Sequence, residues 1–229
     1  MNKIKGLLLD FNGTLFFDTE YHMKAFMGFY PEFGLPTPDR DYMINNVFGR
    51  SNEDMYPDQF NPDATKEEID AFTEAKERKY MDLCYKYPEK LHLVEGAPEM
   101  LDYLKENNIP FCLATGSPLM NVNFYFEALG IGRWFSFDNI VYCDGSFPGK
   151  PAPDIYKLAA DRLGLDTSEC AVFEDGTSGI LSANAAGVSK VMALWEEGVP
   201  SPLTEKTRVD GIYHSLKDWK NILSSIGII

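Results

Sequence analysis

Residues 5–15, KGLLLDFNGTL, decide the fold of this chain. The apolar run Leu7–Leu9 is unbroken, which is typical of a parallel strand buried on both faces, because such a strand has no solvent side to alternate toward. The run stops at Asp10, and the pair Asn12-Gly13 favours a turn. Ligands of open α/β sheets bind at the carboxyl ends of the strands, which is where Asp10 would lie. The same aspartate is equally suited to capping the next helix, so this stretch alone leaves both interpretations open.

The composition is that of a globular protein with a strong acidic excess. The chain has 229 residues, 45% of them hydrophobic, and a formal net charge of −14. This length suits one large α/β domain or a core with a smaller insert. The negative charge argues against nucleic acid and anionic membranes as partners, because phosphate backbones require a basic surface. Binding of a phosphorylated ligand would therefore need a local metal ion or lysine.

The cysteines and the N-terminal residues bear on the cellular compartment. The four cysteines are widely spaced and form no CxxC pair, so neither a zinc site nor a redox motif is indicated. The N-terminal residues lack the pattern of a signal peptide, and no apolar run approaches the length of a membrane span. We expect a soluble, cytoplasmic protein that acts as a monomer.

Residues 17–91 contain no strand pattern and predict a small helical unit inserted into a larger domain. Asp18 or Thr19 can cap a first helix that runs through Phe29, and TKEE at 65–68 opens a long second one. The apolar or partly apolar positions of this long helix are Ile69, Phe72, Ala75, Tyr80 and Leu83.

From residue 92 onward, strand and helix patterns alternate, which predicts a parallel sheet with helices on both faces. Strands are expected at 109–114, 139–143, 170–173, 190–194 and 211–213. Together with residues 1–16, residues 92–229 are therefore expected to form a Rossmann-like core of the α/β class.

Polar side chains of complementary chemistry follow several of these strands. Thr115 and Ser117 follow one strand, Glu174 and Asp175 follow another, and Lys150 lies in a turn before a helix. On one parallel sheet these groups face one crevice together with Asp10. Neighbouring carboxylates with oxygen-only ligands favour Mg²⁺, and the hydroxyls and the lysine suit a phosphate group.

The motifs resemble those of the haloacid dehalogenase superfamily, in particular its phosphatases and mutases that carry an inserted helical cap, such as β-phosphoglucomutase. DFNGT at 10–14 is similar to the first motif of the family, and Thr115 in ATGS is similar to the second. Lys150 in GKPAPDIY matches the third motif, and FED at 173–175, with Gly179 and Gly187, matches the fourth. All four occur in order and cover essentially the whole chain.

The resemblance implies a role for each motif residue. Asp10 would be the nucleophile that becomes an aspartyl-phosphate. Mg²⁺ would be held by Asp10, the main-chain carbonyl of Asn12 and Asp175, with Glu174 assisting through water. The residues that would bind the substrate phosphoryl group are Thr115, Gly116, Ser117 and Lys150.

Asn12 departs from the family pattern. Phosphatases and mutases of the family have an aspartate here, which protonates the leaving oxygen and then activates the attacking water. An amide cannot hold or take that proton near neutral pH. General acid–base catalysis contributes roughly 10²–10⁴-fold to a rate, so turnover should suffer in this chain. Mg²⁺ binding should survive, because the expected ligand at residue 12 is the main-chain carbonyl.

Two residues of the expected cap are candidates for substrate recognition. His22 lies twelve positions after Asp10, where the resemblance places a cap histidine, and Arg50 in FGRS looks like part of a specificity loop. A histidine on an amphipathic helix and an arginine in a capping turn also have ordinary structural interpretations.

The function predicted is a Mg²⁺-dependent phosphatase acting on a small phosphorylated metabolite, a sugar phosphate or a nucleotide-like monoester. A sugar-phosphate mutase is the alternative within the family, and hydrolysis is favoured because water is the default acceptor. A protein that binds Mg²⁺ and phosphate with little catalysis, impaired by Asn12, is the alternative of a different class.

Overall fold

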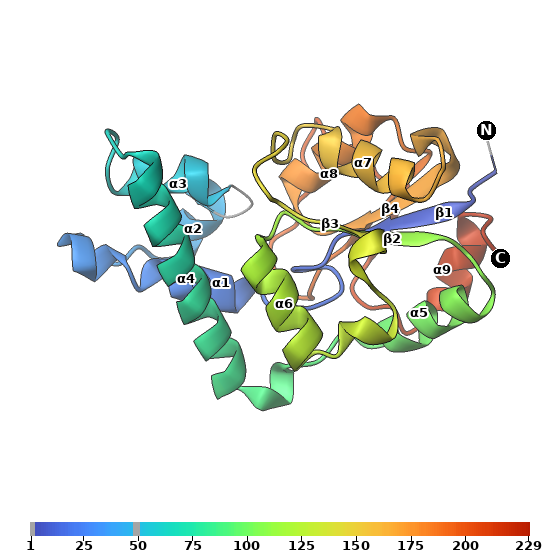
Figure 1. Ribbon diagram of the computed structural model, residues 1–229, viewed down its shortest axis with the longest axis horizontal. Helices are drawn as coiled ribbons and strands as arrows, with labels where there is room; N and C mark the ends of the chain where they lie inside the picture. Colours follow the sequence, from blue (N-terminus) through green and yellow to red (C-terminus); the bar gives the residue numbers. More distant parts are fainter. Residues whose placement is uncertain (1–2, 48–50) are drawn as a thin grey trace. The chain divides into compact units, whose positions relative to one another are not determined.

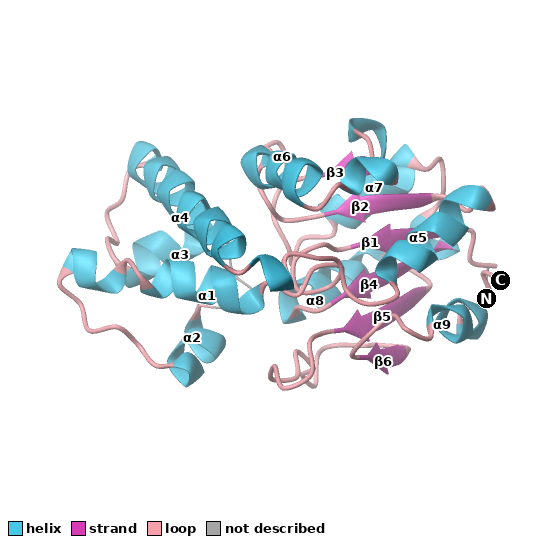
Figure 2. Ribbon diagram, turned by 90° about the horizontal axis from the view of Figure 1, so that it is seen from below, coloured by secondary structure: helices cyan, strands magenta, loops and turns pink. Residues whose placement is uncertain are grey.

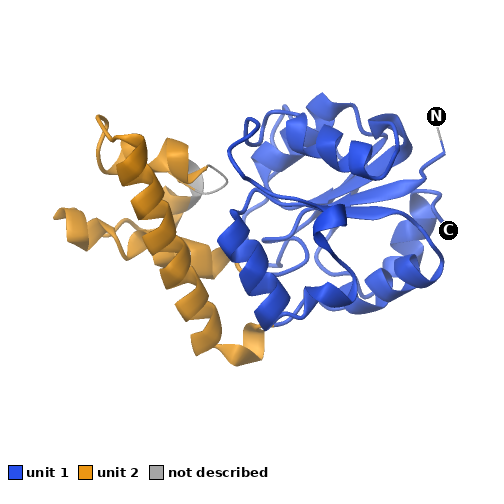
Figure 3. Ribbon diagram, in the orientation of Figure 1, with its two compact units in different colours: residues 1–17, 92–229 blue, residues 18–91 orange. Residues whose placement is uncertain are grey.

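A computed structural model of the protein describes residues 3–47 and 51–229. The chain divides into two compact units, one built from residues 1–17 and 92–229 and the other from residues 18–91 (Figure 3). Within the described part of the chain, no helix combines the length and the apolar character needed to cross a membrane.

The first unit is built on a six-stranded parallel sheet with the strand order β3-β2-β1-β4-β5-β6 (Figure 2). β1 lies in the middle, and the order reverses beside it, because the chain first adds β2 and β3 on one side and then β4 on the other. The strands are β1 Gly6–Leu9, β2 Phe111–Ala114, β3 Ile140–Val141, β4 Cys170–Glu174, β5 Lys190–Leu194 and β6 Gly211–Tyr213.

Helices cover both faces of this sheet, as expected for an α/β core of parallel strands (Figure 1). α7 and α8 lie on one face, and α5 and α9 lie on the other. The leucines of β1 are completely buried between these layers, and burial of each such side chain stabilises the fold by about 1.5–3 kcal/mol. The helices of this unit are α5 Ala97–Glu106, α6 Leu119–Ala128, α7 Asp154–Arg162, α8 Thr177–Ala186 and α9 Trp219–Ser225.

The strand predicted at 139–143 is shorter than expected. β3 consists only of Ile140 and Val141, and Cys143 lies beyond its end. β3 is an edge strand that pairs only with β2, over a register of two residues, so there is no second neighbour to extend it. None of the four cysteines forms a disulfide. Burial raises the pKa of Cys112 and of Cys170 to about 12, which makes these two thiols unreactive.

The second unit is helical. It contains α1 Thr19–Met27, α2 Arg40–Asn46, α3 Asn52–Gln59 and α4 Lys66–Lys86, with a 3₁₀ turn over Tyr30–Phe33. The start predicted for the long helix is confirmed, because Thr65 and Glu68 form a reciprocal capping box at its N-terminus. The first helix ends at Met27, earlier than expected, and the 3₁₀ turn that contains Pro31 follows.

The buried residues of α4 include charged ones as well as apolar ones. Ala75 is exposed, whereas Lys76 and Glu77 are buried next to Tyr80. Lys76 contacts His22 and Glu77, and Phe72 on the same helix packs in an apolar cluster of this unit.

Candidate active site

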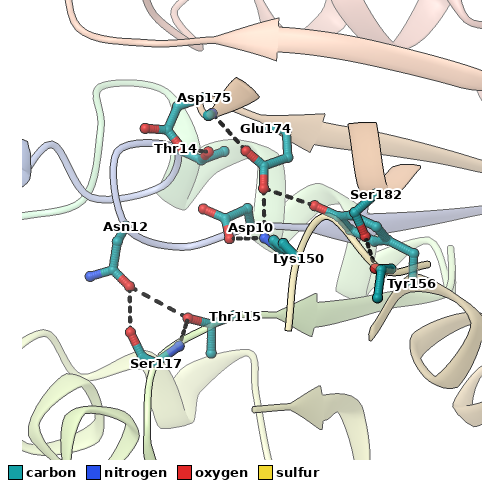
Figure 4. A network of polar contacts seen from close by, with 12 residues as sticks. Asp10, Asn12, Thr14, Thr115, Ser117, Lys150, Tyr156, Glu174, Asp175 and Ser182 are labelled. Atoms are coloured by element: carbon teal, nitrogen blue, oxygen red, sulfur yellow. Dashed lines mark hydrogen bonds and ion pairs between the residues drawn. The ribbon is translucent and has the colours of Figure 1, made fainter. Parts of the chain in front are cut away.

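The register of the sheet brings Asp10 next to Glu174. Leu9 at the end of β1 pairs with Phe173 in β4 and with Leu113 in β2. The residues that follow Leu9 and Phe173 are therefore neighbours at the carboxyl edge of the sheet (Figure 4). This edge lies where the strand order reverses, which is the usual ligand-binding position of such sheets.

Lys150 lies between these two carboxylates. Its Nζ is 2.6 Å from Asp10 Oδ1 and 2.6 Å from Glu174 Oε1 (Figure 4). The turn that carries it, just before α7, is held in place because Ser182 Oγ donates a hydrogen bond to the carbonyl oxygen of Ala152 at 2.6 Å. The predicted meeting of the first, third and fourth motifs is thus present in the structure.

Burial and charge set the protonation of this group. Burial raises the pKa of Asp10 to about 7 in the metal-free protein; Lys150 opposes this rise, and Glu174 adds to it. Burial by itself would lower the pKa of Lys150, but the charges of Asp10 and Glu174 hold that pKa well above its ordinary value. Lys150 therefore stays protonated. The ionised form of Asp10 beside it is energetically unfavourable unless a second cation is bound nearby.

Glu174 is buried and closely surrounded. One of its carboxylate oxygens accepts hydrogen bonds from Lys150 and from Tyr156 OH at 3.1 Å, and the other accepts one from the backbone N–H of Gly176 at 2.8 Å. A Cβ atom at Gly179 would lie 1.6 Å from Glu174 Oε1, so only glycine leaves room for this side chain. Tyr156 was not among the predicted site residues, because a tyrosine within an amphipathic helix gives no sign of contacting a motif residue.

Asp175 lies beside the turn that follows β1. Thr14 Oγ1 is 3.4 Å from Asp175 Oδ1, and a Cβ atom at Gly13 would lie 1.9 Å from Asp175 Oδ2. Gly13 also adopts a φ of 76°, in the left-handed region that favours glycine. Gly13 in the turn of the first motif therefore leaves space for the Asp175 carboxylate of the fourth motif.

Asp10, Glu174 and Asp175 can offer ligand atoms that lie within 4.8 Å of one another. Three carboxylates beside one lysine carry excess negative charge, and oxygen ligands suit a hard cation such as Mg²⁺. Both oxygens of Glu174 already accept hydrogen bonds, so Asp10 and Asp175 are the better placed direct ligands. The donor set fits the ion that the motifs predicted.

The second motif meets Asn12 on the other side of Asp10. Ser117 Oγ donates to Asn12 Oδ1 at 2.7 Å, and Thr115 Oγ1 lies 3.4 Å from the same atom (Figure 4). The backbone N–H of Ser117 donates to Thr115 Oγ1 at 3.2 Å, while Gly116 between them is exposed. The loop thus presents two hydroxyls next to residue 12.

A tyrosine that was not predicted completes this side of the site. Tyr125 in α6 is completely buried, and its hydroxyl lies 2.8 Å from Asn12 Nδ2 and 3.0 Å from Ser117 Oγ. It stands eight positions after Ser117 in an aromatic run, and such a run predicts core packing only.

His22 belongs to the helical unit, where it lies in a polar cluster. Its ring stacks on Tyr80 at a centroid distance of 3.7 Å, and its Nδ1 is 2.9 Å from Lys76 Nζ. Lys76 also contacts Glu77 at 2.7 Å, and Tyr80 OH donates to Asp18 at 2.5 Å. We call these five residues the helical-unit cluster. Arg50, the other predicted recognition residue, lies outside the described residues.

Comparison with known proteins gives concordant matches. The haloacid dehalogenase-like hydrolase family matches residues 4–187. The Drosophila melanogaster protein named "Probable pseudouridine-5′-phosphatase" is 39% identical over 137 residues, which span 56% of this chain and 56% of that protein. Protein CbbY of Rhodobacter capsulatus is 29% identical over 228 residues, covering 95% of this chain and 92% of the relative.

A solved structure agrees over nearly the full length. The crystal structure of a HAD hydrolase of family IA, variant 3, from Entamoeba histolytica superposes with a TM-score of 0.85 at 31% identity. The match covers 97% of this chain and 99% of that one. The chain therefore belongs to the haloacid dehalogenase-like hydrolases and is a hydrolase. The family and the α/β fold class predicted from the motifs are confirmed.

Proposed function

We propose that the protein is a Mg²⁺-dependent phosphatase of a small phosphorylated metabolite and that it acts through an aspartyl-phosphate on Asp10. The observation that carries the proposal is the placement of Asp10 at the carboxyl edge of β1, beside Lys150, Glu174 and Asp175. Relatives with phosphatase names, including the pseudouridine-5′-phosphatase match, support the substrate class.

In this proposal each residue of the site has a separate task. Asp10 attacks the phosphorus atom, while Lys150 and the hydroxyls of Thr115 and Ser117 hold the phosphoryl oxygens. Asp10 and Asp175 would hold Mg²⁺, which supplies positive charge against the carboxylates and the phosphoryl group. Glu174 positions Lys150, whose Nζ it contacts directly.

The experiment is a phosphatase assay with p-nitrophenyl phosphate on the wild-type chain, Asp10→Ala and Asp161→Ala. Asp161 is an exposed aspartate of α7 and serves as the control. Asp10→Ala is expected to abolish turnover and the hydroxylamine-sensitive phosphoenzyme, whereas Asp161→Ala keeps both. EDTA is expected to inactivate the wild type and Mg²⁺ to restore it. Full activity of Asp10→Ala would refute the aspartyl-phosphate, and turnover in EDTA would refute the metal requirement.

One observation favours a second function, the binding of Mg²⁺ and phosphate with little catalysis. Residue 12 is an amide, and an amide carries no exchangeable acid–base function near neutral pH. The phosphatase assay and a calorimetric titration with phosphate together decide between the two functions. A binding protein would bind phosphate in the presence of Mg²⁺ but show no measurable turnover.

A further inference from the structure

The hydroxyl of Tyr156 and the ammonium group of Lys150 share one acceptor. Lys150 Nζ and Tyr156 OH lie 2.6 Å and 3.1 Å from Glu174 Oε1 (Figure 4). An ionised carboxylate only accepts hydrogen bonds, so the phenol is the donor to it. The Lys150 ammonium also lies over the Tyr156 ring, 5.2 Å from its centroid, which is within the range of a cation–π interaction. Tyr156 therefore contacts both members of the Lys150–Glu174 pair.

The packing of the fold fixes the position of Tyr156. This residue lies in the first turn of α7, and it is completely buried. The turn between Lys150 and α7 is tied to α8, because Ser182 Oγ donates to the carbonyl oxygen of Ala152. A side chain that is packed on all sides has few alternative rotamers, so the hydroxyl and the ring of Tyr156 stay next to the lysine.

Lys150 is shared evenly between two carboxylates. Its Nζ lies 2.6 Å from Asp10 Oδ1 and 2.6 Å from Glu174 Oε1. Asp10 is the proposed nucleophile, so a phosphoryl group next to it needs the ammonium, and Glu174 competes for the same ammonium. A hydrogen bond from another donor offsets part of the charge of Glu174, and such a bond is stronger in the protein interior than in water. Tyr156 provides this bond at the very oxygen that Lys150 contacts.

We propose that Tyr156 is a positioning residue of the phosphoryl-binding site: its hydroxyl weakens the attraction of Glu174 for Lys150, so that the ammonium stays available to a phosphoryl group beside Asp10. The inference rests on the proposed function and adds one residue to it. Tyr156 acts through Lys150 and Glu174 and takes no part in making or breaking bonds. Its loss should therefore weaken the binding of phosphate more than it slows the chemical step.

The test measures the Kd of inorganic phosphate by calorimetry at saturating Mg²⁺, together with KM and kcat for p-nitrophenyl phosphate. The variant Tyr156→Phe keeps the ring under the ammonium and removes only the hydroxyl. Without that donor, Glu174 holds the ammonium more tightly, so Kd and KM are expected to rise about tenfold. The value of kcat is expected to change by less than about threefold, because binding in the ground state and in the transition state weakens alike.

Tyr30→Phe is the matched control. Tyr30 is a buried tyrosine of the helical unit, and its hydroxyl donates to Gln59 Oε1 at 2.7 Å. Both variants lose a buried hydrogen bond and should unfold at lower urea concentration, but Tyr30→Phe should keep the wild-type Kd and KM. An unchanged Kd in Tyr156→Phe, with a wild type that turns over, would make Tyr156 purely structural and overturn this inference alone. A wild type that neither binds phosphate nor turns over would overturn the proposed function and this inference with it.

A double-mutant cycle with Lys150→Met shows whether Tyr156 acts through the lysine. In the Lys150→Met background, adding Tyr156→Phe is expected to change kcat/KM by less than about twofold, because the ammonium that Tyr156 positions is gone. A further tenfold loss in that background would show that the hydroxyl affects the site by another route, and the inference would be wrong.

Discussion

A largely buried lysine lies among carboxylates in each unit of this protein, and the two surroundings differ. At the sheet edge, Lys150 bridges Asp10 and Glu174, and Asp175 adds a third carboxylate. In the helical-unit cluster, Lys76 contacts one carboxylate, that of Glu77, and one imidazole.

The difference lies in the balance of charge. The cluster at the sheet edge has three carboxylates for one lysine, and burial raises the pKa of Asp10 to about 7. The helical-unit cluster has two carboxylates, and Asp18 accepts a hydrogen bond from the hydroxyl of Tyr80. The excess of carboxylates over lysines is therefore larger at the sheet edge. A larger excess of buried negative charge favours binding of a cation or a reaction, whereas the smaller excess in the helical-unit cluster is more typical of a group that holds its helices together.

The largest difference between the two clusters is expected from removing each lysine. Lys150→Met is expected to lower kcat/KM by about 10³-fold, because the phosphoryl group loses its fixed cation. Lys76→Met is expected to lower it by less than about tenfold. Both variants leave buried carboxylates uncompensated and should lose roughly 3–5 kcal/mol of unfolding free energy. Urea unfolding and p-nitrophenyl phosphate kinetics measure both effects, and an equal loss of activity would show that the two clusters do not differ as argued.

The second prediction concerns pH and stability of the protein in EDTA. An aspartate in the unfolded chain titrates near pH 4, whereas the pKa of buried Asp10 is about 7. Between these values the folded protein keeps a proton that the unfolded chain has released. Its unfolding free energy should therefore fall by roughly 3 kcal/mol as the pH rises from about 4 to about 7, and then level off.

Asp10→Asn should lack this part of the fall, because its amide does not titrate. Lys150 and Glu174 remain in that variant, so the difference between the two stability curves isolates Asp10. Parallel curves for the wild type and Asp10→Asn would show that Asp10 is ionised throughout this range.

The third prediction concerns Asn12, the amide that lies at the sheet edge near Asp10. Asn12→Asp is expected to raise kcat toward alkyl phosphates by roughly 10²-fold, because it supplies a proton carrier. The affinity for Mg²⁺ should change much less, since the expected ligand at residue 12 is the main-chain carbonyl. Steady-state kinetics and Mg²⁺ titration measure the two quantities. An unchanged kcat would remove acid–base chemistry from position 12.

The smallest effect is expected in the helical-unit cluster. His22→Ala removes the ring stacked on Tyr80 and a contact with Lys76, which should cost about 1 kcal/mol of stability. If His22 also recognises substrate, as the family resemblance implies, kcat/KM should fall by about tenfold. A fall in stability with kcat/KM unchanged for every accepted substrate would leave His22 a purely structural residue.

The sequence by itself determined the sheet and its polar edge. Apolar runs such as Leu7–Leu9 specify buried strands, because a strand covered on both faces must be apolar throughout. The carboxyl ends of parallel strands meet at one edge, so the residues that directly follow each run are neighbours in any sheet of this kind. The positions of Asp10, Thr115 and Glu174 follow from this rule.

Only the tertiary structure decided which side chains surround those motif residues. Tyr125 and Tyr156 contact Asn12 and Glu174 because of how their helices are rotated and packed on the sheet, which helical periodicity alone leaves undetermined. The same holds for Lys76, a charged residue that sequence patterns assign to the surface. Its burial depends on partners distant in the chain, since a buried charge is tolerated only where the fold supplies them.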